Sequence, residues 1–116
     1  ILEKNTGVEP FNISKSLEAL IKSKDYGPYA SEELGSVPVN FLSDLDITNG
    51  NSGSATINNN FELVGLAFDG MLETIISDYS FIPEARTISV DSRYLLWTLD
   101  KVENAENLLE EIEIVN

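Results

Sequence analysis

Apolar residues follow a helical period near the start of the chain. Residues 12–24 predict an amphipathic helix with Asn12 as its N-cap, because lysines and serines lie opposite a single apolar stripe. That stripe consists of Ile13, Leu17, Leu20 and Ile21. Residues 25–35 mix glycine, proline and charged residues without a period, which predicts a loop.

The pattern then changes to the alternation that is typical of β-strands. Residues 37–47 predict a strand that starts at a sheet edge, because Pro38 cannot donate to a central ladder. Residues 54–57, an asparagine turn at residues 58–60 and a return strand at residues 61–68 predict a hairpin, since asparagine tolerates left-handed backbone angles. The return strand is apolar on both faces over most of its length, so it should lie in the middle of its sheet.

The second half of the chain begins with an irregular segment and ends in helices. Residues 69–86 have no steady period and predict a packed loop or a short irregular strand. Residues 87–90 predict a strand, after which Asp91 should cap a helix. Asn104 should cap a final helix. The residues that this final helix should bury are Leu108, Leu109 and Ile112.

The order of helix, strands and helices favours a mainly β fold with flanking helices over a βαβ alternation. A length of 116 residues suits one domain. Within it we expect a helical and loop lead-in over residues 1–36, a β part over residues 37–90 and C-terminal helices over residues 91–116.

Composition excludes several classes of function. Asp and Glu number 20 against 7 Lys and Arg, a formal net charge of −13, so we expect no nucleic-acid partner and no attraction to anionic lipids. The chain has no cysteine and no histidine, which excludes disulfides and thiolate catalysis and leaves only carboxylates as zinc ligands. We therefore predict no metal and no cofactor.

The apolar runs and the first residues of the chain carry no sign of a membrane span or a signal peptide. No stretch approaches the roughly 18 apolar residues of a membrane span. The first residues, ILEKNTGVEP, include neither an initiator Met nor the features of a signal peptide. We expect the chain to be a piece of a longer protein.

The loop TNGNSGSA, residues 48–55, carries the candidate chemistry. A serine hydroxyl can attack a carbonyl carbon when two backbone N–H groups receive the negative charge that develops on the oxygen. Ser52 would be that nucleophile, and the N–H groups of Gly50 and Ser52 would be the donors. Gly50 permits backbone angles that a side chain forbids, and Gly53 leaves room for a substrate. The same residues also suit an ordinary turn, and histidine, the usual base, is absent.

Four stretches of the chain resemble successive signatures of one family: DYGPYA, VPVNFLSDLDITNGNSGS, ELVGLAFDG and RTISVDSRYLLWTLDK. They are similar to the bacterial dipeptidyl-peptidases with a chymotrypsin fold, typified by dipeptidyl-peptidases seven and eleven. The resemblance runs from about Glu3 to about Ile114 and is to the C-terminal end of a much longer protein. It implies the second β-barrel of a chymotrypsin-like double barrel, followed by a C-terminal helix.

The resemblance also implies the roles of the site residues. Ser52 is the nucleophile, and Gly50 contributes its N–H group to the oxyanion hole. Asp69 pairs with the free α-amino group of the peptide, and Gly70 lies at the S1 pocket, which takes the P1 side chain. Phe68 belongs to the same substrate-binding group. In the family, a glycine at the position of Gly70 goes with bulky apolar P1 residues, and an arginine there goes with acidic ones. Gly70 therefore leads us to expect a hydrophobic P1 residue.

Partners and location follow from the same resemblance. The histidine and aspartate of the catalytic triad lie far upstream in such enzymes, so the chain should be inactive alone. Its expected partners are a peptide substrate and the missing N-terminal half of the parent enzyme, and the parent is a candidate homodimer. The parent should reside in the periplasm or at the outer membrane. The isolated chain should expose an apolar face around Phe41, Phe68 and residues 71–82.

Three positions depart from the family pattern, which usually reads Gly-Gly-Asn-Ser-Gly-Ser-Pro in the loop and has Asn after Asp-Gly. Asn49 replaces the leading glycine, Ala55 the proline and Met71 the asparagine, and none of these changes removes a catalytic group. They leave open a second hypothesis, a non-catalytic β domain that binds peptides or other proteins. A third, a β-rich adaptor for a basic partner, rests on the net charge alone.

Overall fold

The computed structural model describes residues 1–76, 79–80 and 82–115. They form two compact units. The helical unit comprises Ile1–Val37 and Leu96–Glu113, and the sheet unit comprises Pro38–Leu95 and the chain end from Ile114.

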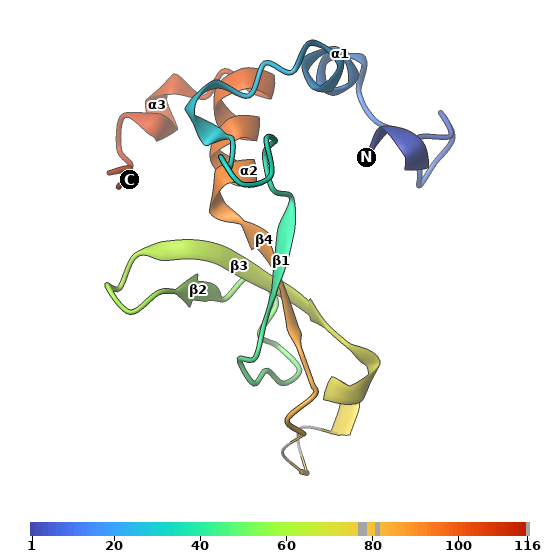
Figure 1. The fold of residues 1–116 in the computed structure, drawn as a ribbon, viewed down its shortest axis with the longest axis vertical. Coiled ribbons are helices and arrows are strands. Elements are labelled where there is room, and N and C mark those ends of the chain that lie inside the picture. Colours follow the sequence, from blue (N-terminus) through green and yellow to red (C-terminus); the bar gives the residue numbers. More distant parts are fainter. Residues whose placement is uncertain (77–78, 81, 116) are drawn as a thin grey trace. The chain divides into compact units, whose positions relative to one another are not determined.

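The elements of both units appear in Figure 1. The strands are β1 (Asn40–Ser43), β2 (Ala55–Ile57), β3 (Leu63–Gly70) and β4 (Thr87–Asp91). The α-helices are α1 (Lys15–Ser23), α2 (Ser92–Trp97) and α3 (Glu106–Leu109). Short 3₁₀ helices cover Leu2–Lys4, Gly27–Tyr29 and Leu72–Ile76, and a π-helix covers Thr98–Val102.

The four strands form one antiparallel sheet in the order β1-β4-β3-β2 (Figure 1). The predicted hairpin is confirmed as β2 and β3, and β3 has the central position expected of it. β1 lies at an edge, as Pro38 ahead of it predicted. The predicted sheet and short helices are present, but the described residues form a mixed fold and not a mainly β one. In these residues the sheet is open, with β1 and β2 as its edges, and does not close into a barrel.

One face of the sheet is buried although small polar side chains line it. Thr87 and Ser89 of β4 have no exposed surface, and Thr56 of β2 is 5% exposed. The Thr87 hydroxyl donates to the carbonyl of Leu45 at 2.6 Å, and the hydroxyl oxygens of Thr56 and Ser89 lie 2.9 Å apart. Because a buried hydroxyl without a partner costs about 1–3 kcal/mol, these bonds are what makes a polar face tolerable here.

At Gly65 of β3, a side chain from β1 packs across the intervening strand β4. A Cβ atom at this position would lie 2.4 Å from the carbonyl oxygen of Val90 and 2.8 Å from Cε1 of Phe41. The ring of Phe41 therefore packs directly on the backbone of β3, which only glycine allows. This contact leaves Phe41 half-buried, although the sequence suggested that its surroundings would be exposed.

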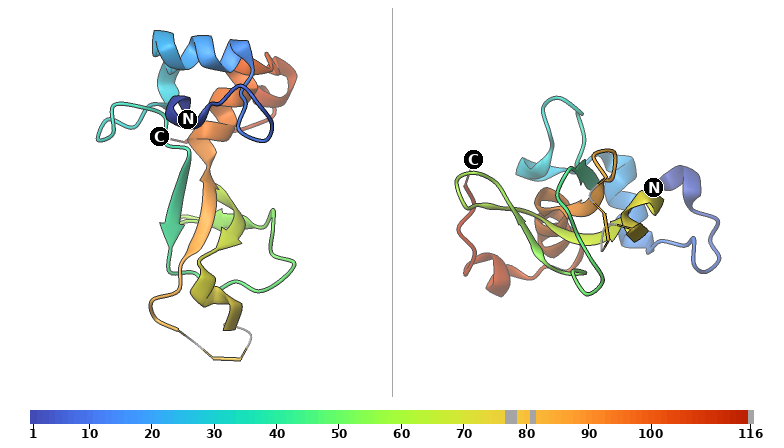
Figure 2. Two further views of the ribbon diagram at one scale, coloured as in Figure 1. Left: turned by 90° about the vertical axis from the view of Figure 1, so that its right-hand side faces the viewer. Right: turned by 90° about the horizontal axis from the view of Figure 1, so that it is seen from below.

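The helical unit is organised around Trp97, which is 2% exposed. Its indole N–H donates to the carbonyl of Asp25 at 2.8 Å, and its ring meets the edge of the Tyr26 ring with centroids 6.5 Å apart. The loop predicted at residues 25–35 is thus anchored to α2. α1 packs against the π-helix of the same unit (Figure 2). Within the described part of the chain, no helix is both long and apolar enough to cross a bilayer.

The predicted N-terminal helix is confirmed as α1, but Asn12 as its cap is wrong. Ser14 is the N-cap, and its hydroxyl accepts a hydrogen bond from the N–H of Leu17 at 3.2 Å. The Asn12 amide instead donates to Glu9 at 2.9 Å. Both residue types make good caps, so the sequence pattern alone could not decide which of them the chain would place at the first turn.

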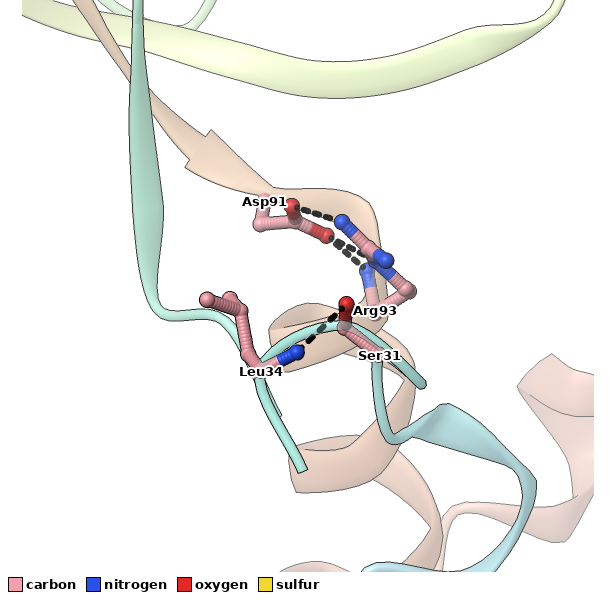
Figure 3. A network of polar contacts seen from close by, with 4 residues as sticks. All are labelled: Ser31, Leu34, Asp91 and Arg93. Atoms are coloured by element: carbon pink, nitrogen blue, oxygen red, sulfur yellow. Dashed lines mark hydrogen bonds and ion pairs between the residues drawn. The ribbon is translucent and has the colours of Figure 1, made fainter. Parts of the chain in front are cut away.

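Asp91 is the last residue of β4 and caps α2, as predicted. Its Oδ1 atom accepts from the backbone N–H of Arg93 at 2.9 Å, and its two oxygens accept from the Arg93 guanidinium at 2.9 and 2.8 Å (Figure 3). The hydrogen bond to Asp91 raises the pKa of Arg93 above its usual value, although burial acts in the opposite direction. The pair closes the end of the strand at the start of the helix.

Two other predicted boundaries are wrong. The strand expected over residues 37–47 is limited to β1, since its ladder with β4 ends where Ser43 lies opposite Thr87, the first residue of β4. The carbonyl of Leu45, beyond the ladder, accepts from the Thr87 side chain. The last helix, α3, has Ala105 at its N-cap position, and Asn104 takes a left-handed φ of 51° instead of capping it. α3 covers only four residues, so it cannot bury a stripe that extends to residue 112. Of the three residues predicted to be buried, Leu108 and Ile112 are exposed and Leu109 is half-buried.

The hairpin turn also differs in detail from the prediction. The residue with a left-handed φ, 65°, is Phe61 and not an asparagine. Asn58 organises the turn with its side chain, since its Oδ1 atom accepts from the N–H groups of Asn60 at 2.9 Å and Glu62 at 3.1 Å. The side-chain bonds of Asn58 thus span the turn as far as Glu62, and Phe61 within it takes the left-handed angle.

Substitution of Gly65 by alanine should destabilise the sheet unit. The added Cβ must displace either the Val90 carbonyl or the Phe41 ring, which costs about 3 kcal/mol by comparison with other overpacked sites. Urea unfolding followed by far-UV circular dichroism measures the change. Asn40→Ala, at an exposed position of β1, is the control and should change stability by less than about 0.5 kcal/mol. Equal stability of Gly65→Ala and the wild type would contradict the packing described here.

Candidate functional site

The loop between β1 and β2 is shaped by a local pair of hydrogen bonds. The N–H of Asn51 donates to the carbonyl of Thr48 at 3.2 Å, and the side-chain Oδ1 of Asn51 accepts from the N–H of Thr48 at 2.8 Å. Gly50, between them, has a φ of 94°, which residues with a side chain rarely adopt. Asn51 therefore closes the turn that precedes the serine.

A second pair of backbone hydrogen bonds attaches the loop to β3. The N–H of Gly53 donates to the carbonyl of Ala67 at 2.7 Å, and the N–H of Ala67 donates to the carbonyl of Ser54 at 2.9 Å. These bonds continue the β2–β3 ladder ahead of the first residue of β2. Ser52, one residue before Gly53, is thereby held beside the C-terminal part of β3.

The Ser52 hydroxyl is exposed and donates to the carbonyl oxygen of Phe68 at 3.4 Å. A carbonyl oxygen does not accept a proton near neutral pH, so this partner orients the hydroxyl without activating it. An activating base has to come from a group other than this carbonyl.

The backbone amides around Ser52 differ in their partners. The N–H groups of Asn51 and Gly53 donate to carbonyl groups, as described above. The N–H groups of Gly50 and Ser52 donate no hydrogen bond to any described residue of the chain. The N–H groups of Gly50 and Ser52, which we predicted to be the oxyanion donors, are therefore the ones available to an incoming acceptor.

A β-bulge changes the direction of β3 at its C-terminal end, next to this loop. Ala67 lies opposite Ser89 and Asp69 lies opposite Ile88, so Phe68 is an extra residue between them. A bulge of this kind bends the strand and changes the side to which the following residues point. Asp69 beyond it is exposed, and its Oδ1 atom accepts from the N–H of Gly70 at 2.8 Å.

The loop and the end of β3 enclose a cavity of about 480 Å³, lined by residues 47–52, 67–72 and 74–75. This volume is in the range that holds small ligands. The five residues predicted to be catalytic or to bind substrate all line it: Gly50, Ser52, Phe68, Asp69 and Gly70. Gly53, which was expected to leave room for a substrate, is not in the lining. Among the lining residues Asp69 is the single charged one. The large apolar side chains in the lining are those of Ile47, Phe68, Met71, Leu72 and Ile75.

The space next to Gly70 is occupied by Thr74 of the 3₁₀ helix. A Cβ atom on Gly70 would lie 2.4 Å from Oγ1, 3.0 Å from Cγ2 and 3.1 Å from Cβ of Thr74. The Thr74 hydroxyl donates to the carbonyl of Met71 at 2.6 Å, and its backbone N–H donates to the same carbonyl at 2.9 Å. The absence of a side chain at Gly70 is therefore matched by a fixed threonine at the edge of the cavity.

The segment after β3 exposes apolar side chains, as the sequence suggested for residues 71–82. Leu72 is 78% exposed and Ile75 is 68% exposed, and Phe68 in β3 is 45% exposed. Residues 77, 78 and 81 of that segment lie outside the described residues. Within the residues that are described, no three carboxylates gather as a set of metal ligands.

Comparison with known proteins assigns the chain to a family. The model of the family Peptidase S46 matches residues 1–114. The chain belongs to the peptidase S46 family. The family match spans both structural units of this S46 chain, including the loop and the strand that form the cavity.

Individual relatives of the S46 chain carry two different names. The Asp/Glu-specific dipeptidyl-peptidase of Shewanella putrefaciens is 40% identical over 137 residues, which covers 99% of this chain and 19% of that protein. Dipeptidyl-peptidase 7 of Porphyromonas endodontalis is 44% identical over 106 residues, which covers 90% of this chain and 13% of that protein. The two identities are close, so overall similarity does not decide which specificity the S46 chain shares.

Solved structures confirm the similarity of fold. The crystal structure of Porphyromonas endodontalis DPP11 in complex with the dipeptide Arg-Asp matches with a TM-score of 0.91 and 38% identity, over 97% of this chain and 16% of that one. The S46 chain thus spans less than a fifth of the relatives named here.

Sequence reasoning missed three features of the site. Thr74 and Ile47 were not singled out, because Thr74 lies in a segment without a period and Ile47 was placed in a longer strand. The bulge at Phe68 was also not predicted. Continuous apolar strands carry no pattern that marks an extra residue, so no signal in the sequence could have located it.

Replacement of Asn51 by alanine should loosen the turn that precedes Ser52. It removes the acceptor of the Thr48 N–H, so the amide of Thr48 should exchange with solvent about fivefold faster, which corresponds to the loss of about 1 kcal/mol. Hydrogen exchange followed by NMR measures this rate. Asn51→Asp keeps an acceptor oxygen and serves as the control. Unchanged exchange at Thr48 in Asn51→Ala would show that this bond does not hold the turn.

Proposed function

We propose that this chain is the nucleophile-bearing part of a serine dipeptidyl-peptidase that releases N-terminal dipeptides with a hydrophobic P1 residue. The observation that carries the proposal is the cavity in which Ser52, the unengaged N–H groups of Gly50 and Ser52, and Asp69 line one space. Membership of the S46 family, whose relatives are dipeptidyl-peptidases, supports the class of reaction.

In the proposed reaction Ser52 Oγ attacks the carbonyl carbon of the second residue of the peptide. A bond forms between Oγ and that carbon, and the electron pair of the C=O bond moves to the oxygen, which the N–H groups of Gly50 and Ser52 stabilise. The Oγ proton passes to a base from the rest of the full-length protein, because this chain has no histidine. The same group protonates the leaving amine, and water then hydrolyses the acyl-enzyme.

Asp69 supports the exopeptidase part of the proposal. It is the single charged side chain in the lining of the cavity, and its charge is opposite to that of a peptide α-amino group. Such a pair fixes how far the free N-terminus lies from Ser52, and so selects the peptide bond that reacts. A peptide with a blocked N-terminus lacks the ammonium group that Asp69 would bind.

The lining of the cavity supports a hydrophobic P1 residue over an acidic one. No lysine or arginine occurs among the lining residues, so an acidic P1 side chain would have no cation to pair with there. Five of the lining side chains are large and apolar, as noted above. We also propose that residues of the full-length protein close the open sheet into the second barrel of a double-barrel fold, with the remaining N-terminal part as its partner.

A non-catalytic peptide-binding domain is the second candidate. The observation in its favour is that Ser52 donates to a carbonyl oxygen in this chain instead of a basic group. Such a domain would use the same cavity and the same Asp69, but would not need the Gly50 and Ser52 amides. Covalent labelling of Ser52 separates the two candidates.

In the full-length protein, a fluorophosphonate probe should label Ser52, and Ser52→Ala should abolish labelling. It should also reduce kcat by about 10⁶-fold, as in triad knockouts of serine proteases. Mass spectrometry of the labelled peptide and cleavage of dipeptidyl coumarylamides provide the measurements. Ser54→Ala, two residues away and outside the cavity lining, should keep the label. The isolated 116-residue chain should neither label nor cleave detectably. A label on the Ser52→Ala variant would contradict the assignment.

Asp69→Asn in the full-length protein should lower kcat/KM for substrates with a free N-terminus by at least about 10-fold. The reason is the loss of a charge-assisted hydrogen bond, which contributes about 1.5 kcal/mol or more. N-acetylated substrates, which lack the ammonium group, should not lose activity. Asp44→Asn makes the same change of charge outside the cavity and is the matched control. Equal losses for free and acetylated substrates would exclude the proposed role of Asp69.

A further inference from the structure

Gly70 and Thr74 form a complementary pair at the edge of the cavity. Three atoms of the Thr74 side chain lie within 3.1 Å of the place that a Cβ atom on Gly70 would take. Real side chains do not approach a Cβ atom to 2.4 Å, so the two positions cannot both carry their side chains in this arrangement. The glycine at position 70 admits Thr74, and the volume beside it is not left empty for a substrate.

Thr74 is held in place more firmly than an ordinary surface threonine. Its hydroxyl and its backbone N–H both donate to the carbonyl of Met71. Met71 is itself attached to the neighbouring strand segment, since its N–H donates to the carbonyl of Arg86 at 2.9 Å. A β-branched side chain is stiff at χ1, and the bond to the Met71 carbonyl selects one of the rotamers open to threonine, so Thr74 acts as a rigid part of the wall.

Thr74 also differs from its neighbours in the lining. Leu72 and Ile75, from the same 3₁₀ helix, are largely exposed, whereas Thr74 is half-buried against Gly70. Long apolar side chains at exposed positions can move to fit a ligand, whereas a β-branched side chain packed against Gly70 has little freedom to do so. The rigid part of this wall therefore sets the limit on what fits next to Gly70.

We propose that Thr74 is a specificity-determining residue that limits the size of the P1 side chain beside Gly70. The inference rests on the proposed dipeptidyl-peptidase function. Removal of the Thr74 hydroxyl and methyl groups enlarges the cavity by about the volume of two heavy atoms. A difference of one methylene group in an apolar pocket changes kcat/KM by about 10-fold or more, so the effect is measurable.

The test uses the full-length protein and dipeptidyl coumarylamides that share one N-terminal residue and carry Leu or Trp at P1. Fluorophosphonate labelling of Ser52 counts the competent sites in each preparation, so a poorly folded variant is corrected for. Thr74→Ala should raise the ratio of kcat/KM for Trp over Leu by about 10-fold. Thr74→Val keeps the shape and loses the hydroxyl, and its ratio should stay within about threefold of the wild type.

A second pair of variants tests the contact itself. Gly70→Ala should lower kcat/KM per labelled site for the Leu substrate, and Thr74→Ala in the same chain should restore most of the loss, because only the 3.1 Å contact to Cβ remains. Failure of this rescue would overturn the inference. An unchanged Trp-to-Leu ratio in Thr74→Ala would overturn it too, and so would an equal change in Thr74→Val.

Failure of the proposed function gives a different result. A wild-type full-length protein that takes no label and cleaves neither substrate would refute both the dipeptidyl-peptidase function and the inference that rests on it. Cleavage by the wild type combined with an unchanged ratio in Thr74→Ala refutes the role of Thr74 alone.

Discussion

Two backbone hydrogen bonds between the serine loop and β3 hold the site together. The N–H of Gly53 meets the carbonyl of Ala67, and the N–H of Ala67 meets the carbonyl of Ser54. Ser52 is part of the loop, whereas Asp69 and Gly70 end the strand, so these bonds are what makes three residues up to 18 positions apart line one cavity. Gly53 makes its bond with a φ of 88°, an angle that residues with a side chain rarely adopt.

The sheet behind the loop gives these bonds a firm support. Small residues of β2 and β4 line its buried face, where the hydroxyl groups of Thr56 and Ser89 are paired between strands and that of Thr87 is bonded to the carbonyl of Leu45. Such pairs fix strands relative to one another more specifically than apolar contacts, since a shifted register would leave the hydroxyls buried without partners. Phe41 closes over Gly65 and adds the large apolar contact that the small residues lack.

The S46 family and the cavity answer different parts of the functional question. Relatives with similar identity to this chain include an Asp/Glu-specific dipeptidyl-peptidase and a dipeptidyl-peptidase 7, so membership of the family does not decide between these two specificities. In the proposed function the choice of P1 depends on a few side chains around Gly70, and so few positions contribute little to an overall identity. The charge and size of the cavity lining therefore carry the proposal of a hydrophobic P1 residue.

Local patterns in the sequence determined the elements whose causes are local. α1, the β2–β3 hairpin, β4 and the Asp91 cap could be predicted, because helical spacing, turn residues and capping act over a few positions. The loop around Ser52 and the Asp69-Gly70 pair could be picked out by glycine placement and by the family resemblance, although their roles remain proposals.

Contacts between distant residues decided what the sequence could not. The short β1, the bulge at Phe68 and the place of Thr74 each depend on a partner elsewhere in the chain: Thr87 for the Leu45 carbonyl, Ser89 and Ile88 for the bulge, Gly70 for Thr74. The prediction that the final helix buries its apolar side chains was wrong for the same reason. An apolar stripe shows which residues could be buried, but not whether a surface is present to cover them. A sequence pattern records the preferences of a segment, whereas only the folded chain determines which of them finds a partner.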